Sequence, residues 1–277
     1  MKKLLIASIL FLLIMIPVRG ELSVNIGGLY SGPFNIGNFS LTTNYTDTGN
    51  IVSFTETNRS DFTGSGGFGF NAGIAFFFNY KMGFGVNASF IKTGFDISNS
   101  FNWKWEWWDS TVGQIDPKTW LNKGSVSSIP ISFNIIFRAV SSDKFKVNLF
   151  AGPTVFFTTV ELSGNGGYAD GPVLYSGSYY IDWYDIPLQL SVSETAIGGN
   201  GGLEIEYMLS ESMNFYISAA YYFAGELDLN WKIKPGQYTG EFGSLIANIS
   251  NEDLLPGYTV PVKLSTFILG FGIKVYL

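Results

Sequence analysis

The chain of 277 residues contains no cysteine and no histidine. Without cysteine there is no disulfide framework and no thiolate chemistry. Without histidine, the Ser–His and Asp–His units of nucleophilic catalysis cannot be built. The acids Asp182 and Asp185 remain as a conceivable general acid and base, although paired loop acids are usually just solvated. We therefore expect no enzyme activity, no cofactor and no metal site.

Charged residues are also scarce. They make up 14% of the chain, against roughly 25% in ordinary soluble domains. Acidic residues outnumber basic ones by 22 to 16. Nucleic-acid binding needs clustered Lys and Arg, so the composition argues against a nucleic acid as partner.

The N-terminus has a pattern of its own. The basic segment Met1–Lys3 precedes an apolar run from Leu4 to Ile16. The run ends at Pro17–Gly20, in which Val18 and Gly20 are the small residues that a signal peptidase prefers. This order is typical of a secretory signal peptide. The run is shorter than the roughly 20 residues that a membrane helix needs. We predict a signal peptide over residues 1–20 and one domain over residues 21–277, with 13 basic and 22 acidic residues and a net charge of −9.

Apolar residues are abundant but dispersed: 46% of the chain is hydrophobic and 17% aromatic, with 33 glycines. The stretch Leu264–Leu277 shows how they are arranged. Every second residue is apolar, as in Phe267, Leu269 and Phe271, whereas Gly270, Gly272 and Lys274 lie between them. Successive side chains of a strand point to opposite faces, so one face is apolar and the other small or polar. This alternation is typical of a membrane β-barrel.

Seven further stretches alternate in the same way, and long and short connections follow each other between them. The predicted strands are Glu21–Tyr30, Gly67–Asn79, Gly83–Asp96, Ser125–Val140, Phe145–Leu162, Thr195–Met208, Met213–Leu229 and Leu264–Leu277. The long connections are Ser31–Gly66, Ile97–Gly124, Ser163–Glu194 and Asn230–Val262. Open strand edges are costly in lipid, so the last strand must pair, and the first is its best partner.

We predict an all-β fold, a closed eight-stranded antiparallel transmembrane β-barrel with short periplasmic turns and four long extracellular loops. A soluble barrel would need charged residues along its outward face, whereas the polar face here is Gly, Ser and Asn. A ten-stranded barrel, with Phe101–Trp108 in an added hairpin, stays open as an alternative.

Three segments carry a resemblance to a known family. Gly201–Ser210 with Phe215–Tyr222, the segment Phe150–Val155 and the terminal Leu269–Leu277 resemble the hairpins of small OmpA/OmpW-like outer-membrane β-barrel proteins. The resemblance implies the bacterial outer membrane, with its lipid and lipopolysaccharide as partners, and the barrel-assembly machinery acting through the C-terminal strand. The chain ends in Leu277, where many such proteins end in Phe. Barrel enzymes of this membrane resemble one another in an essential histidine, which is absent here. We expect a monomer.

Inward-facing charges gather near the short turns. An eight-stranded barrel is just wide enough for side chains to fill it, and unpaired buried charges are costly, so these charges must pair. We expect Lys146 and Glu206 at similar depth and Lys274 beside Glu21 across the closing seam. The predicted lumenal ion cluster comprises Glu21, Arg138, Lys146, Glu204, Glu206 and Lys274. It is interpreted as a structural plug, with a gate on a narrow path as the alternative.

The long connections carry aromatic residues. The candidates are Trp103, Trp105, Trp107, Trp108, Tyr180 and Trp183. We favour an aromatic girdle at the lipid interface; a hydrophobic or carbohydrate contact surface is the alternative.

The expected role of the protein is structural, or surface interaction through the long loops, since large inward residues favour a plugged lumen. A narrow conduit for small or hydrophobic solutes, which the OmpW-like resemblance allows, is the alternative. The residues that favour plugging are Phe77, Phe150, Phe156, Tyr222 and Tyr276.

Overall fold

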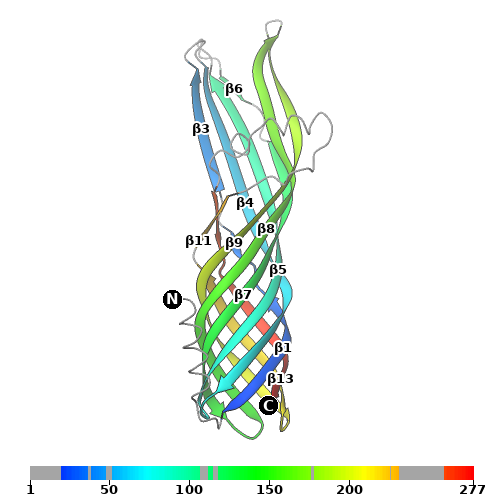
Figure 1. Cartoon of the computed structure of the whole chain (residues 1–277). Coiled ribbons are helices and arrows are strands. Elements are labelled where there is room, and N and C mark those ends of the chain that lie inside the picture. Colours follow the sequence, from blue (N-terminus) through cyan, green and yellow to red (C-terminus); the bar gives the residue numbers. More distant parts are fainter. Residues whose placement is uncertain are drawn as a thin grey trace.

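The computed structural model of the chain describes its β-strands and the turns between them (Figure 1). It describes residues 20–36, 39–47, 52–106, 112–114, 118–175, 178–224, 226–230 and 259–277. The predicted signal peptide lies outside this range, apart from Gly20. No helix in the described ranges is long and apolar enough to cross a membrane.

Thirteen strands are present in the described residues. Their bounds are β1 (Glu21–Ser31), β2 (Asn35–Ile36), β3 (Phe39–Asp47), β4 (Val52–Phe77), β5 (Met82–Glu106), β6 (Val112–Gln114), β7 (Lys118–Ser141), β8 (Phe145–Tyr175), β9 (Ser178–Ser210), β10 (Met213–Ala224), β11 (Glu226–Asn230), β12 (Thr259–Lys263) and β13 (Thr266–Tyr276). Eight of them close a ring in the order β1–β4–β5–β7–β8–β9–β10–β13, with every neighbour antiparallel. The eight-stranded prediction is confirmed, and the ten-stranded alternative is wrong for the ring.

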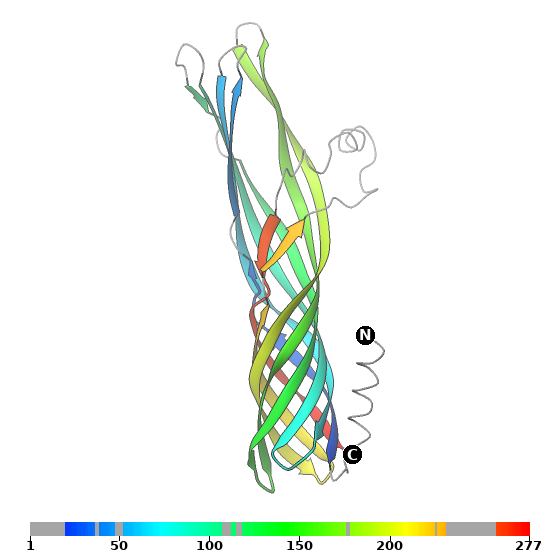
Figure 2. The ribbon, with the colours of Figure 1, turned by 60° about the vertical axis from the view of Figure 1, so that its left-hand side comes forward.

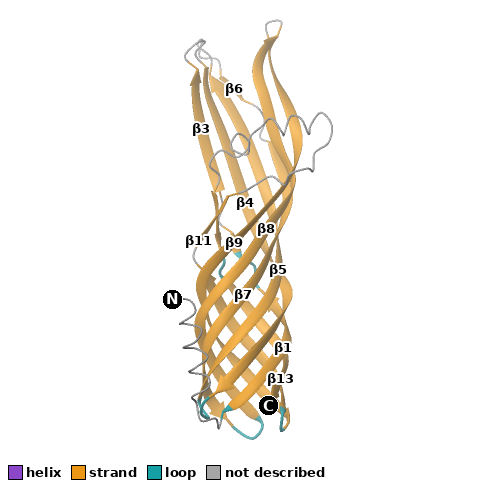
Figure 3. Cartoon of the chain, viewed as in Figure 1, coloured by secondary structure: helices purple, strands orange, loops and turns teal. Residues whose placement is uncertain are grey.

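The seam of the ring joins the first strand to the last, as predicted. Val24 lies opposite Val275, and the pairing continues to Ser31 opposite Ile268. The three short turns lie at one end of the barrel, drawn lowest in Figure 3. In the first of them, the Asn79 side-chain oxygen accepts hydrogen bonds from the backbone N–H groups of Lys81 and Met82, at 2.8 and 2.7 Å. Such side-chain bonds to the backbone favour Asn in turns.

The segments predicted as long loops are largely strand. β8 runs for 31 residues and β9 for 33, so the third predicted loop is a continuous hairpin. β4, β5 and β7 also extend far past the barrel, and Phe101–Glu106 belongs to β5 (Figure 1). The four long connections are present as predicted, but their strand structure is not predicted, because most of these segments lack the apolar-outward alternation of the lipid-facing strands. Antiparallel pairing with a neighbour nevertheless satisfies their backbone groups.

On the other side of the ring, β1, β10 and β13 are short, with 11, 12 and 11 residues. A small antiparallel sheet in the order β11–β12–β2 continues the structure beyond them. Figure 2 shows β11 and β12 as orange and red arrows above the barrel. The fourth predicted loop is thus partly strand, and residues 231–258 lie outside the described range.

Two adjacent glycines on β1 give a sharp test of the seam. A Cβ on Gly27 would lie 2.2 Å from the Phe271 carbonyl oxygen and 2.4 Å from the Tyr216 hydroxyl, whereas one on Gly28 would first meet the tip of the Phe271 ring, at 3.0 Å. Backbone cannot yield as a side chain can. We expect Gly27→Ala to destabilise the barrel by about 1–3 kcal/mol and Gly28→Ala to cost clearly less. Urea titration, followed by the heat-modifiable band on gels, measures the stability of both variants. Equal losses of stability in the two variants would contradict this packing.

Candidate functional site: the barrel lumen and its two ends

The outward and inward faces of the barrel exchange polarity partway along the long strands. On β5, Phe84 and Val86 face outward and are 37% and 40% exposed, whereas Ser89 is buried inside. Farther along the same strand Lys92 is exposed and Phe95 is buried. The outward face becomes polar at the same point at which the inward face becomes apolar.

β8 repeats this inversion. Leu149 and Phe157 are exposed outward, and Asn148 is buried inside. Beyond them Glu161 is exposed and Val160 is buried. An apolar outward belt is what lipid requires, and a polar outward face over an apolar core is what water requires. The level of Lys92 and Thr159 is therefore the upper boundary of the lipid-facing belt, and the structure above it is built for water.

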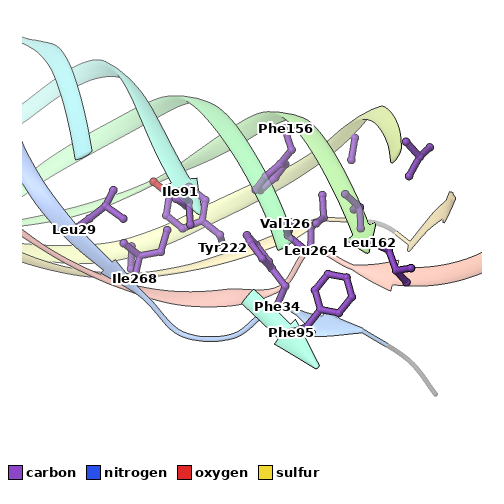
Figure 4. Packing of buried hydrophobic residues seen from close by; sticks show 14 of the residues in the cluster. Leu29, Phe34, Ile91, Phe95, Val126, Phe156, Leu162, Tyr222, Leu264 and Ile268 are labelled. Atoms are coloured by element: carbon purple, nitrogen blue, oxygen red, sulfur yellow. The ribbon is translucent and has the colours of Figure 1, made fainter. Parts of the chain in front are cut away.

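From the upper part of the belt to above this boundary, the inside of the barrel is filled with apolar side chains, called here the apolar plug (Figure 4). Its buried residues are Leu29, Phe34, Ile91, Phe95, Ile97, Val126, Phe156, Val160, Leu162, Val192, Ala196, Ala220, Tyr222, Leu264 and Ile268. Leu264 and Phe34 come from the segments that flank the short strands β13 and β1, so they close the side of the ring whose strands are short. Of the large residues predicted to face inward, Phe156 and Tyr222 lie in this plug and Phe150 packs against it.

At the other end lies a charged layer with two groups. In the first, the Arg138 guanidinium donates two hydrogen bonds to the Glu21 carboxylate, at 3.0 and 3.2 Å, and the Lys146 ammonium donates a third, at 3.0 Å. Phe77 lies beneath the guanidinium, 4.0 Å from ring centre to the Arg138 carbon. Bidentate Arg–carboxylate pairs are among the strongest hydrogen-bonded contacts in proteins.

In the second group the Lys274 ammonium lies between the carboxylates of Glu204 and Glu206, with 2.9 Å to the latter. The Asn148 amide donates to both carboxylates, at 3.1 and 2.6 Å, and the Asn214 amide donates to Glu206 at 2.7 Å. Glu206 is completely buried, so each of these donors replaces a lost water.

Tyr276 joins the two groups. Its hydroxyl donates to Glu206 at 2.5 Å, and the Lys146 ammonium lies 3.8 Å from the centre of its ring. The predicted pairing of Lys274 with Glu21 is wrong. In the seam Lys274 lies opposite Asn25, four positions from Glu21, and its partners come from β9. Lys146 lies opposite Glu206 in register, yet its ammonium bonds to Glu21.

The amides and Tyr276 complete a network of which the predicted cluster contained only the charged residues. Asn148 and Asn214 alternate with outward apolar residues, so their side chains face inward, next to charged positions. This inward position is the feature of the sequence that could have identified them as members of the network. Three acids face three bases, so the layer carries no net charge. Within the described residues, no group of three or more acidic side chains has the geometry of a metal site.

Between the charged layer and the apolar plug lies a cavity of about 60 Å³, called here the chamber. Its polar lining includes five asparagines: Asn25, Asn71, Asn87, Asn134 and Asn148. Glu204 and Lys274 lie in its wall on the charged side, and Leu29, Tyr222 and Ile268 on the plug side. Along its axis the lumen is thus charged, then amide-lined, then apolar.

The four predicted loop aromatics in the described part of the chain do not lie at the lipid interface. Trp103 and Trp105 are in β5, opposite Glu56 and Phe54, and Trp103 is 11 positions past Lys92. Tyr180 and Trp183 are in the distal part of β9, opposite Val173 and Ala169. Trp107 and Trp108 lie outside the described residues. The distance along the strands excludes the girdle for these positions, because 11 residues span about 36 Å of strand.

Other aromatic pairs occupy the two levels at which a girdle is expected. Tyr30 and Phe68 make an edge-to-face contact at the upper boundary, with ring centres 5.4 Å apart. Phe145 and Tyr207 lie near the short turns, with ring centres 5.1 Å apart. Alternation along a strand shows only that these side chains point outward, whereas the strand register shows that they lie at the ends of the outward apolar face.

A closed antiparallel ring of eight strands with an outward apolar belt defines the class: the chain is a transmembrane β-barrel. No protein-family model matches the chain, and no curated protein matches it.

Solved structures of outer-membrane proteins align with most of its length. The outer membrane protein OprG from Pseudomonas aeruginosa is 13% identical over 93% of this chain and 96% of its own, with a TM-score of 0.44. The outer membrane protease OmpT from Escherichia coli is 6% identical over 93% and 96%, with a TM-score of 0.40. The attachment invasion locus protein Ail of Yersinia pestis is 16% identical over 93% and 99%, with a TM-score of 0.36. The class assignment rests on this chain's own ring and belt.

Proposed function

We propose that the chain is a non-catalytic protein of the bacterial outer membrane that holds rigid hairpins outside the cell for surface interaction, with its lumen closed. The observation that carries the proposal is the β8–β9 hairpin. Its register continues beyond Ser163 opposite Gln189 to Tyr175 opposite Ser178, with one irregularity between Asp170 and Val173. A strand crosses a membrane in about 9–11 residues, so most of this hairpin stands clear of the lipid.

The distal hairpin also offers strand edges. β7 pairs with β8 only as far as Ser163, and β10 pairs with β9 only as far as Gly198. In the described part of the chain, no strand pairs in register with the outer edge of β9 between Ser178 and Ile197, although β11 approaches β9 beyond the end of β10. Such an edge is a template onto which an extended segment of another molecule can add as a strand.

The charge of the hairpin selects the kind of partner. No Lys or Arg occurs between Lys146 and Lys232, whereas the hairpin carries Glu161, Asp170, Asp182, Asp185 and Glu194. Asp170 and Asp182 are directly opposite each other in register. A second copy of the chain would be repelled, and an extended cationic segment would be attracted. The proposed partner is therefore a cationic polypeptide in extended form.

Shortening the hairpin tests this role. Replacing residues 164–188 with Asn-Gly, a two-residue sequence suited to a tight hairpin turn, joins Ser163 to Gln189, which are opposite each other. We expect the shortened protein to keep its heat-modifiable band and to lose at least 10-fold in retention on an immobilised lysine-rich peptide, an electrostatic effect of ~1.4 kcal/mol or more. The full-length protein with Asp170, Asp182 and Asp185 changed to Asn should lose retention as well. Unchanged retention in both would contradict the proposal.

A second candidate function, a narrow conduit for small solutes, is favoured by the chamber in the lumen. Planar-bilayer recordings separate the two functions. We expect no conductance steps from the wild type. We also expect none from the double variant Glu21→Gln/Arg138→Gln, because the apolar plug closes the lumen independently of the charged layer. Conductance steps that occur only in the double variant would favour the charged layer as a gate on a conducting path over its interpretation as a structural plug.

A further inference from the structure

The chamber contains buried acceptors that the protein leaves without a hydrogen bond. Asn134 and Asn148 are 3% and 1% exposed, and both line the cavity. The side-chain oxygen of each has no hydrogen-bond partner in the described protein. The amide nitrogen of Asn148 is committed to Glu204 and Glu206, so its oxygen is held in place beside them. A buried acceptor without a partner costs about as much free energy as a lost hydrogen bond.

The chamber is bounded at both ends by buried side chains. On the periplasmic side the Arg138 and Lys274 side chains are each 4% exposed and Glu206 is fully buried. On the other side Ile91 and Phe156 are each 1% exposed. A ligand inside is therefore largely surrounded by protein, and the space open to it is about 60 Å³.

We propose that the chamber is a binding site for a small cluster of trapped water molecules that donate hydrogen bonds to Asn134 and Asn148. The volume suits the ligand, because the roughly 10–15 Å³ that one water requires on this measure of cavity space is a fraction of 60 Å³. Several waters fit, and each finds several amide or hydroxyl partners in the wall, including Asn71, Asn87 and Tyr216. Polar cavities of this kind hold water, whereas apolar cavities stay dry.

The charges of the wall argue against a metal cation as the occupant. Lys274 already places an ammonium group in the wall, and it is matched by the carboxylates beside it. A further cation would meet that ammonium at short range, and Glu206 already accepts hydrogen bonds from Asn148, Asn214 and Tyr276. Water needs no counter-charge and supplies the donors that the two amide oxygens lack.

Hydroxyl-radical labelling by X-ray radiolysis, read by mass spectrometry, reports water next to buried side chains. The wild-type protein in detergent offers an internal control, because Phe150 lines the chamber and Phe156 lies in the apolar plug. After each rate is divided by the intrinsic reactivity of its residue type, we expect Phe150 and Tyr216 to be oxidised at least five times faster than Phe156 and Val126. Equal rates for the two sets would overturn the proposal.

Substituting Asn134 provides a second, independent measurement. Asn134→Leu replaces an amide with an apolar group of similar size. In a dry cavity this change removes an unsatisfied acceptor and raises the urea midpoint, whereas in a hydrated chamber it breaks water bonds and lowers it. We expect the midpoint to fall, with Thr195→Leu on the exposed outward face as a control that leaves it unchanged. A raised midpoint for Asn134→Leu would contradict the proposal. If the variant fails to fold, the labelling experiment decides alone.

Adding Na⁺, K⁺ or Ca²⁺ salts should leave the urea midpoint of the wild type unchanged. A specific rise with one cation would identify an ion as the occupant instead.

Discussion

Replacing Lys274 with methionine should destabilise the barrel by about 3–5 kcal/mol, the usual cost of removing one partner from a buried ion pair. The ammonium of Lys274 is the cationic partner that Glu204 and Glu206 share, and its side chain is 4% exposed. Without it, two neighbouring carboxylates face each other inside the lumen with only amide and hydroxyl donors. The midpoint of urea unfolding in detergent micelles, followed by the heat-modifiable band, measures the loss.

The chain provides a matched control and a rescue for this prediction. Lys144→Met removes a lysine from an exposed turn and should change stability by less than ~0.5 kcal/mol. Adding Glu204→Gln and Glu206→Gln to Lys274→Met removes all three charges and should recover a large part of the loss. If Lys274→Met changes the urea midpoint as little as Lys144→Met, the charged layer contributes nothing to stability. Its interpretation as a structural plug then fails.

A charge placed in the middle of the apolar belt should have an effect of similar size. Ile217 lies opposite Phe271 in register, and both are more than half exposed on the outward face. We expect Ile217→Arg to cost about 2–4 kcal/mol, as for arginine near the midplane of a bilayer, and Thr195→Arg, at the upper boundary, to cost about 0–1 kcal/mol. Refolding into liposomes at a series of urea concentrations measures both.

The contrast between these two positions tests where the belt ends. Thr195 is exposed on the outward face of β9, two residues before Ile197 in the chain and farther from the short turns. Ile197 is 76% exposed. If Thr195→Arg were as costly as Ile217→Arg, the lipid would reach higher than the inversion of polarity indicates. The portion of the strands built for water would then have to be placed farther along the chain.

The ring could be predicted because lipid enforces a simple rule on every strand. Outward positions such as Phe271 must be apolar, and the period of two fixes which residues those are. Above the lipid the rule reverses, so that Phe95 and Val160 are inward while Lys92 and Glu161 are outward. A strand that changes its polar face midway breaks this pattern, so the alternation alone predicts loops where the hairpins continue above the boundary.

The partners within the lumen could not be predicted by the same rule. Alternation shows that Glu21 and Lys274 face inward, but it does not show how far one strand is staggered against the next. That stagger places Asn25 opposite Lys274 in the seam and brings Glu21 against Arg138 and Lys146 of β7 and β8. The shear of a barrel is a property of the closed ring, so no single strand reveals it.

The charged layer also has a consequence for how the chain assembles. Four of its six charges, two basic and two acidic, lie on the consecutive strands β7, β8 and β9. The remaining two arrive from the opposite ends of the chain: Glu21 on β1 completes the basic pair, and Lys274 on β13 completes the acidic pair. An incomplete sheet would leave Lys146 and Glu206, which are opposite each other, to pair together. Closing the seam exchanges these partners, so the final arrangement of ion pairs exists only in a ring of the correct strand number and stagger.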